Sequence, residues 1–160
     1  MPTQRKDKDY SKLKNHTTSI TIEKTMGEIE KILATHGATH IFKMYNNEGT
    51  PTALAFKALV DGQEISFKLP MEENKILDVF KKHAFKGKLP KRYINDIDQA
   101  RRTGWRIIKD WVDSQMALIE IHLVTLDEVF LPYMYDALKD ETMYDKLKQQ
   151  NFNMRLEYKD

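Results

Sequence analysis

The sequence predicts an α+β protein whose small, mostly antiparallel four-stranded sheet is built from one strand, a helix and a three-strand meander. A long C-terminal helix and shorter helices are expected to pack on this sheet. Three observations predict the fold: a β-branched stretch at residues 17–22, alternating apolar and polar residues over 39–69, and apolar residues three and four apart over 94–123. The length of 160 residues suits one core, so we predict a single domain over residues 16–160.

The composition excludes several classes of protein. The chain has no cysteine, which excludes disulfides, thiolate catalysis and Cys-ligated zinc. No apolar run approaches the roughly 18 residues that span a bilayer, and residues 1–15 lack the apolar segment of a secretion signal. We therefore expect a cytoplasmic protein with no membrane partner.

The N-terminal region is predicted to contain an arm, a strand and a helix. Residues 1–15 carry five Lys or Arg and two Asp, so we expect a flexible basic arm. The sequence TTSITI at 17–22 predicts a strand. Thr25 and Glu28 have the spacing of a helix-capping box, and Gly37 is expected to end the helix that they begin.

Three strands of an antiparallel meander are expected next, at residues 39–45, 52–60 and 63–69. The sequence NNEG separates the first two and predicts a turn. The sequence DG separates the last two and is typical of a type I′ hairpin.

The following region is predicted to be mainly helical. Residues 72–82 form a short amphipathic helix, and residues 83–88 form a loop. Pro90 is expected to open a helix of about 30 residues. Within it, Gly104 marks either a kink or a close packing contact.

Two more helices are predicted near the C-terminus. Thr125 and Glu128 form a second capping box, which opens a helix through Leu138. Residues 142–149 form the next helix, and residues 151–160 form either a closing strand or a tail.

We find no catalytic motif in the sequence. The glycines do not form a phosphate-binding loop, and the predicted helix end lies between His36 and His40, so neither a metal site nor a cofactor is expected. A metal-dependent nuclease is a further alternative that would draw on a pool of carboxylates, but helix capping and pairing with neighbouring cations explain these residues better. This pool is Asp96, Asp98, Asp110, Asp113 and Glu120.

Positive charge is concentrated in residues 81–109, which hold ten basic and two acidic residues and therefore carry +8. The whole chain carries only +2. Such a strip attracts polyanions, whereas the competing explanation is a solvated surface with local ion pairs. The candidate nucleic-acid-binding residues are Lys81, Lys82, Lys86, Lys88, Lys91, Arg92, Arg101, Arg102, Arg106 and Lys109.

Spacing adds detail to this strip. Arg102, Arg106 and Lys109 follow steps of four and three, which predicts one ridge on the long helix. Aromatic residues lie among the cations and could stack on unpaired bases, which favours single strands as the ligand. The candidates for stacking are Phe85, Tyr93 and Trp105.

Residues 25–33 (TMGEIEKIL), 45–57 (YNNEGTPTALAFK) and 101–109 (RRTGWRIIK) resemble a family of small uncharacterised bacteriophage and prophage proteins. The similarity covers residues 17–131, with the same order of helix start, hairpin and Trp-Arg helix. It implies a phage-encoded protein in the cytoplasm of the host cell. It supplies no catalytic residues.

These features predict a non-catalytic, phage-type nucleic-acid-binding protein whose partner is single-stranded DNA or RNA. The alternative is a protein–protein interaction module. Such a module would assemble with itself as a homo-oligomer or bind and inhibit a host protein.

Overall fold

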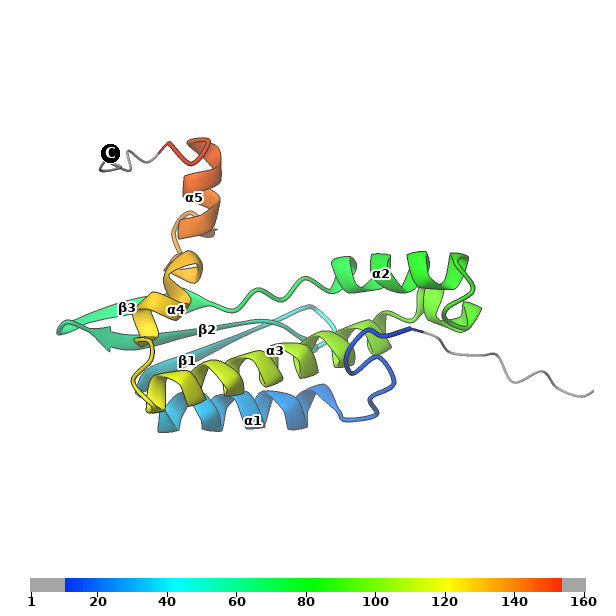
Figure 1. Ribbon diagram of the computed structural model, residues 1–160, viewed down its shortest axis with the longest axis horizontal. Helices are drawn as coiled ribbons and strands as arrows, with labels where there is room; N and C mark the ends of the chain where they lie inside the picture. The colour runs from blue at the N-terminus through cyan, green and yellow to red at the C-terminus, as the bar shows by residue number, and fades with distance from the viewer. Residues whose placement is uncertain (1–10, 154–160) are drawn as a thin grey trace, which may run out of the picture. The chain divides into compact units, whose positions relative to one another are not determined.

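A computed structural model describes residues 11–153 of the chain (Figure 1). These residues divide into two compact units. The first unit contains the described residues up to Lys31 together with Met71–Ser114. The second contains Ile32–Pro70 and the described residues from Gln115 onward. The single domain over residues 16–160 stays a prediction. Most of the predicted basic arm, residues 1–10, and most of the predicted closing strand or tail, residues 154–160, lie outside the described residues.

The fold is α+β, but the predicted four-stranded sheet is wrong. Three strands form one sheet and two short strands form another. The missing strand is the predicted one at 17–22, where Ile22 instead begins helix α1 (Ile22–Thr35). The main-chain oxygens of His16 and Thr18 accept hydrogen bonds of 2.8 and 2.9 Å from the side chain of Gln99. This side chain provides partners that a neighbouring strand would otherwise supply.

Helix α1 begins four residues before the predicted position. The hydroxyl of Thr21 accepts a hydrogen bond from the Lys24 amide at 3.2 Å, so Thr21 is the capping residue. Thr25 lies inside the helix and is fully buried. The predicted end is confirmed, since Gly37 adopts a left-handed conformation with φ of 101° directly after the helix.

The predicted meander is confirmed in the second unit. Strands β1 (Ala38–Tyr45), β2 (Pro51–Val60) and β3 (Gln63–Lys68) are antiparallel and lie in the order β1-β2-β3. Asp61 and Gly62 both have positive φ, 49° and 79°, as the predicted type I′ turn requires.

A cluster of aromatic rings forms part of the core of the second unit. Phe56 and Phe67 pair across β2 and β3, with ring centroids 5.3 Å apart. The ring of Phe130 meets Phe56 edge to face at 5.4 Å. All three side chains are fully buried. These contacts hold the helix that contains Phe130 on one face of the meander.

The long helix is neither as long as predicted nor at the C-terminus. Residues Lys91–Asn95 form a separate 3-10 helix, η1, and α3 spans Ile97–Glu120. Asp96 separates them, because its carboxylate accepts a hydrogen bond of 3.0 Å from the Gln99 amide and so caps α3. The preceding helix α2 (Glu73–Phe85) continues three residues beyond the end that was predicted.

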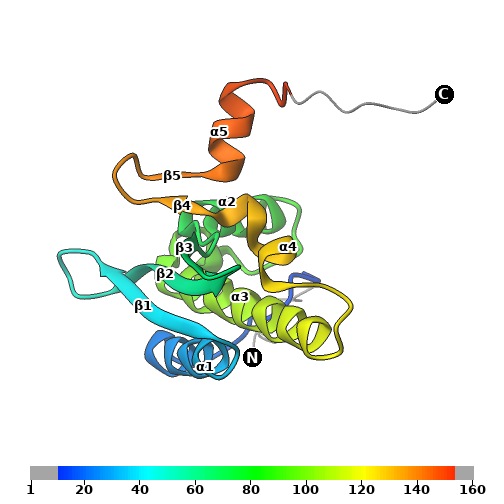
Figure 2. The ribbon, with the colours of Figure 1, turned by 90° about the vertical axis from the view of Figure 1, so that its left-hand side faces the viewer.

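Several short elements follow α3 in the second unit. They are α4 (Leu126–Phe130), the 3-10 helix η2 (Leu131–Tyr133), β4 (Tyr135–Asp136), β5 (Glu141–Thr142) and α5 (Met143–Gln149). The predicted capping box of Thr125 and Glu128 is confirmed, but α4 ends at Phe130 instead of Leu138. Figure 2 shows the β4–β5 hairpin leading into α5. Thr142 and Asp145 cap α5, which confirms the helix predicted at 142–149.

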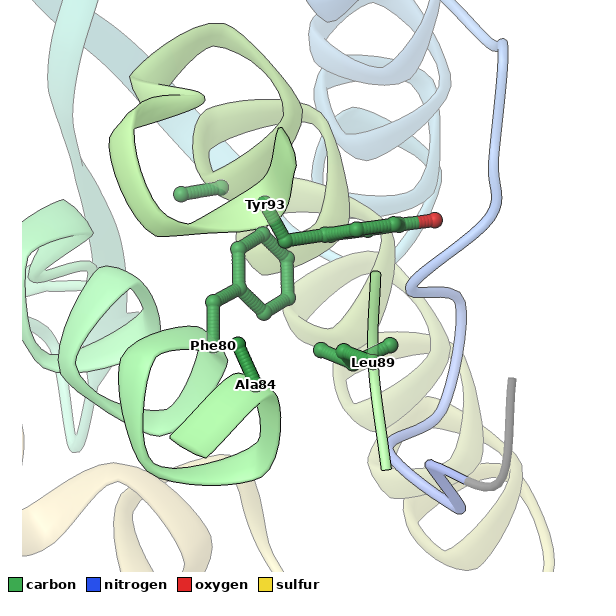
Figure 3. Packing of buried hydrophobic residues seen from close by; sticks show 5 residues of the cluster. Phe80, Ala84, Leu89 and Tyr93 are labelled. Carbon is green, nitrogen blue, oxygen red and sulfur yellow. The ribbon is translucent and has the colours of Figure 1, made fainter. Parts of the chain in front are cut away.

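The first unit has its own apolar cluster, in which Phe80, Ala84, Leu89 and Tyr93 gather between α2 and η1 (Figure 3). In the same unit, α3 approaches α2 closely at Gly104. A Cβ atom added to Gly104 would lie 2.2 Å from the Ile76 Cδ1 atom. Of the two predicted roles for this glycine, the structure therefore shows the close packing contact.

Candidate nucleic-acid interface

The ten candidate basic residues fall into two sets, and the four on α3 are largely engaged by partners within the first unit. Arg101 donates from Nε to Glu73 at 2.6 Å and from a terminal nitrogen to the second oxygen of Glu73 at 3.2 Å. It also contacts Asp98 at 3.2 Å. The hydrogen bond to Glu73 is the main reason that the pKa of Arg101 is raised. Its side chain is only 12% exposed.

Arg106 also has a carboxylate partner, whereas the partner of Arg102 is a neutral amide. Arg106 forms an ion pair with Glu28 of α1 and lies 3.5 Å from the hydroxyl of Thr25. Arg102 donates two hydrogen bonds, of 2.7 and 3.2 Å, to the side-chain oxygen of Gln99. These contacts orient the two guanidinium groups within the unit and leave fewer of their N–H groups for an external phosphate.

Lys109 belongs to a network around Asp110. Its amino group lies 3.8 Å from the carboxylates of both Asp110 and Asp113. Asp110 also accepts from Asn15 at 2.9 Å and pairs with Lys14 at 3.1 Å. Burial alone would raise the pKa of Asp110, but the hydrogen bonds from Asn15 and Lys14 outweigh it and lower the pKa. This network holds the segment before α1 against α3.

The other six basic residues, which we name the α2–η1 cluster, are not engaged in this way. Among residues 11–153, none of them forms an ion pair with a carboxylate, and residues 81–92 contain no acid at all. Apart from the half-buried Lys81, all are exposed. The cluster consists of Lys81, Lys82, Lys86, Lys88, Lys91 and Arg92.

The local fold explains why these side chains face outward. Gly87 adopts a φ of 68°, which turns the chain at the end of α2. The amide of Lys88 donates to the His83 carbonyl at 2.8 Å. Leu89 and Tyr93 are buried in the apolar cluster of Figure 3 and anchor the chain on either side of Lys91 and Arg92.

The three candidates for stacking are in different environments. Trp105 is fully buried, and Tyr93 is only 5% exposed because it packs against Phe80. The guanidinium group of Arg92 lies 5.4 Å from the centre of the Tyr93 ring. Phe85, in contrast, is 82% exposed at the end of α2. Of the three, only Phe85 presents its ring to solvent.

Phe85 lies among the cations of the cluster. Lys81 and Lys82 precede it by four and three residues in α2, so they share its side of the helix. Lys86 and Lys88 follow it in the turn after the helix. An exposed aromatic ring with lysines close to it in the chain suits a ligand that offers both aromatic bases and phosphates.

A structural role accounts for part of this charge. Lys82 and His83 lie in the last turn of α2, where positive charge offsets the helix dipole. Lys88, Lys91 and Arg92 lie beyond that turn, so the dipole explains them less well. The charge of the cluster therefore exceeds what helix stability requires.

The carboxylates of the nuclease alternative do not gather at one point. Within residues 11–153, no group of three or more potential ligands is close enough to hold a metal ion. Asp96 caps α3, Asp98 contacts Arg101, and Glu120 lies 2.6 Å from the Nε2 atom of His36. Each of these carboxylates therefore already has a partner in the described chain.

One feature of the second unit was missed by sequence reasoning. A pocket of about 310 Å³ lies between β3 and the β4–β5 hairpin, and its lining includes Glu64, Ser66, Glu141 and Lys146. Strands of two residues leave no alternating pattern in a sequence. The capping sequence at Thr142 was the only local signal beside this pocket.

In the part of the chain that the structure describes, none of the helices has the length and apolar character needed to cross a membrane. Comparison of the chain with protein-family models, with curated proteins and with solved structures found no match.

Proposed function

We propose that this protein binds nucleic acid without catalysis, with a preference for single-stranded DNA or RNA, through the α2–η1 cluster. The observation that carries the proposal is a group of six cations without carboxylate partners in the described chain, four of which lie within four residues of the exposed Phe85. The proposal includes the bacteriophage context implied by the sequence resemblance, and with it the host cytoplasm as the place of action.

Lysine and arginine side chains would neutralise phosphates, and the release of counterions would drive binding. The slope of log K against log salt is about −0.7 for each phosphate neutralised on a single strand. If four of the six cations engage, we expect a slope of about −3. Arg101 and Arg106 would contribute little, because their guanidinium groups are held by Glu73 and Glu28.

Phe85 would supply the preference for single strands. Bases of a duplex are already stacked on one another, whereas an unpaired base can stack on the exposed ring. Each base stacked on an aromatic side chain contributes about 1–3 kcal/mol to binding. Discrimination between strand types would therefore depend on this one side chain.

The test is titration of the full chain with fluorescently labelled single-stranded and duplex oligonucleotides of equal length, from about 50 to about 300 mM salt. We expect tighter binding to the single strand and a steep loss of affinity with salt. Absence of binding at the lowest salt concentration would refute the proposal.

Two double variants with the same change in net charge test whether nucleic acid binds at the α2–η1 cluster or is attracted by the net charge of the protein. Lys86→Glu with Lys88→Glu changes two cations of the cluster. Lys139→Glu with Lys148→Glu makes the same change in net charge on exposed residues of the second unit. The first pair should reduce affinity by about tenfold or more and the second by much less. Equal losses would show that binding follows net charge alone.

Exposed apolar side chains in the second unit favour a second candidate function, a protein–protein interaction module. Ile121, Leu123, Leu131 and Leu138 are all at least half exposed, and Leu138 is 99% exposed. Exposed apolar side chains mark a binding site for a partner when they lie together in one patch. Light scattering across a range of protein concentrations would test the self-assembling form, and a mass that stays that of a monomer would refute it.

A further inference from the structure

The pocket of the second unit lies along an open edge of the main sheet. Strand β3 is the last strand of the order β1-β2-β3, so one of its edges has no full strand partner. On that side, an isolated antiparallel bridge joins Phe67 to Met134. Beyond this bridge, β4 pairs with β5 instead of continuing along β3. The segments β3 and β4 thus separate, and the pocket of about 310 Å³ lies between them.

The main chain of β3 offers hydrogen-bonding groups on this edge. The Leu69 amide donates to the Leu54 carbonyl at 2.9 Å, which sets the alternation along the β2–β3 pair. By this alternation, the N–H and C=O groups of Phe67 and Ile65 point toward β2. Those of Ser66 and Glu64 point away from β2. The antiparallel bridge of Phe67 to Met134 uses the main-chain groups on either side of Phe67, so it occupies the Ser66 carbonyl and leaves open the Ser66 amide and both groups of Glu64.

The lining of the pocket combines apolar side chains with hydroxyl groups. Ile65, Met134 and Met143 contribute apolar surface, and methionine adapts readily to the shape of a ligand. Ser66 and Thr142 contribute hydroxyls. A lining of this mixture suits a peptide, which has both apolar side chains and polar main-chain groups.

The charge of the lining favours a basic ligand. Three carboxylates, those of Glu64, Asp136 and Glu141, line the pocket together with the single cation of Lys146. Lys146 is already paired with Asp136 at 3.3 Å. Within residues 11–153, the partners of Glu64 and Glu141 are neutral side chains or histidine, since Thr39 and His40 approach Glu64 and the Gln149 amide donates to Glu141. The lining therefore carries a net charge of −2.

We propose that this pocket is a docking site for an extended peptide segment of a partner protein that carries a Lys or Arg side chain. The peptide would add a short strand to the open edge of β3, at the amide and carbonyl of Glu64 and the amide of Ser66. Its main chain would bond with β3, and its basic side chain would lie near Glu64 and Glu141. The proposal concerns the second unit alone and does not depend on nucleic-acid binding.

The experiment uses a synthetic probe, acetyl-Thr-Val-Lys-Val-Lys-Thr-amide, added to the full chain labelled with nitrogen-15. We expect changes in amide chemical shift to concentrate at residues 64–66, 134–136 and 141–142. A second probe has the same sequence with methyl groups on alternate main-chain nitrogens, so it cannot donate the hydrogen bonds of an added strand. We expect this probe to lose binding.

Two further comparisons test whether the acidic lining of the pocket selects a basic peptide. A probe with Glu in place of both Lys residues should bind more weakly. Glu141→Lys should weaken the basic probe by about threefold to fivefold, the size expected for a partly exposed ion pair. Glu48→Lys, on the exposed loop between β1 and β2, makes the same charge change away from the pocket and should leave the affinity unchanged.

Three outcomes would overturn the proposal. Equal binding of the plain and N-methylated probes would show adsorption to an acidic surface instead of strand addition. Equal binding of the Lys and Glu probes would remove the charge selectivity. Shift changes that are absent, or that lie away from the pocket, would show that no peptide docks at this edge.

Discussion

Tyr93 packs edge to face against Phe80, with ring centroids 5.1 Å apart and ring planes at 87°. This contact joins η1 to α2 in the first unit, as Figure 3 shows. Lys91 and Arg92 precede Tyr93 directly, and Lys81 follows Phe80. One buried aromatic pair therefore sets the relative positions of cations from both ends of the α2–η1 cluster.

The first prediction follows from this pair. Tyr93→Ala should lower the free energy of unfolding by about 3 kcal/mol, because it leaves a cavity beside Phe80 and Leu89. Urea denaturation followed by circular dichroism measures this change. Tyr93→Phe retains the ring and should cost much less. A loss for Tyr93→Ala below about 1 kcal/mol would mean that the ring is not a core contact.

The second prediction concerns Arg106 and Glu28, which link α3 to α1. Their side chains are only 13% and 34% exposed. Arg106→Ala should destabilise the fold by about 1–3 kcal/mol, because it leaves the Glu28 carboxylate without its charged partner. In a double-mutant cycle with Glu28→Ala, the double variant should lose less stability than the sum of the two single variants, because both changes remove the same interaction.

The same variant distinguishes the two sets of basic residues. If Arg106 is held by its partner as the structure shows, Arg106→Ala should change oligonucleotide affinity by no more than about twofold once the fraction of folded protein is taken into account. A tenfold loss of affinity with unchanged stability would instead place α3 in the interface.

Elements determined by neighbouring residues could be predicted from the sequence. The meander follows from alternation and from the DG turn, and the helix starts at Thr125 and Thr142 follow from their capping sequences. The concentration of basic residues over 81–109 could also be recognised in the sequence. In each case the determining residues lie within a few positions of one another.

Contacts between distant residues explain what could not be predicted. The segment at 17–22 has strand propensity, but Gln99, some 80 residues later, binds the carbonyls of His16 and Thr18. Glu28 lies 78 positions from Arg106, so spacing alone could not reveal their pairing. The sequence shows where charge accumulates, whereas only the structure shows which charges already have partners.

The third prediction concerns pH and the side chains of Tyr135 and Asp140. The Tyr135 hydroxyl donates to Asp140 at 2.6 Å, which raises the pKa of Tyr135 to about 12. The same hydrogen bond, with a further contribution from Lys68, lowers the pKa of Asp140 below its usual value of 3.8. Each shift favours the state in which a neutral phenol donates to a charged carboxylate.

The sign of each contribution to stability follows from these shifts. The raised pKa of Tyr135 means that its contribution is complete below pH 10 and is lost as pH rises toward about 12. The lowered pKa of Asp140 means that its contribution is complete above pH 3.8 and is lost as pH falls further. Ultraviolet absorbance titration should therefore show one late tyrosine, which Tyr135→Phe removes. Asp140→Asn should return the pKa of Tyr135 toward 10.0.

The fourth prediction concerns Phe85, whose ring is 82% exposed among the cations of the cluster. Phe85→Ala should weaken binding to single-stranded oligonucleotides by about 1–3 kcal/mol, the contribution of one stacked base. Binding to a duplex of the same length should hardly change, because it depends on phosphate contacts. The midpoint of thermal unfolding should also stay the same, since little apolar surface at this position is buried in the folded protein.

Two further variants separate stacking from nonspecific apolar contact. Phe85→Trp retains an aromatic ring and should bind single strands at least as tightly as the natural chain. Phe85→Leu retains an apolar side chain without a ring, so it should resemble Phe85→Ala. If the leucine variant binds like the natural chain, the ring does not stack, and the preference for single strands has no basis in this side chain. If single-strand and duplex affinities fall together, Phe85 acts by shaping the cationic surface instead of by contacting bases.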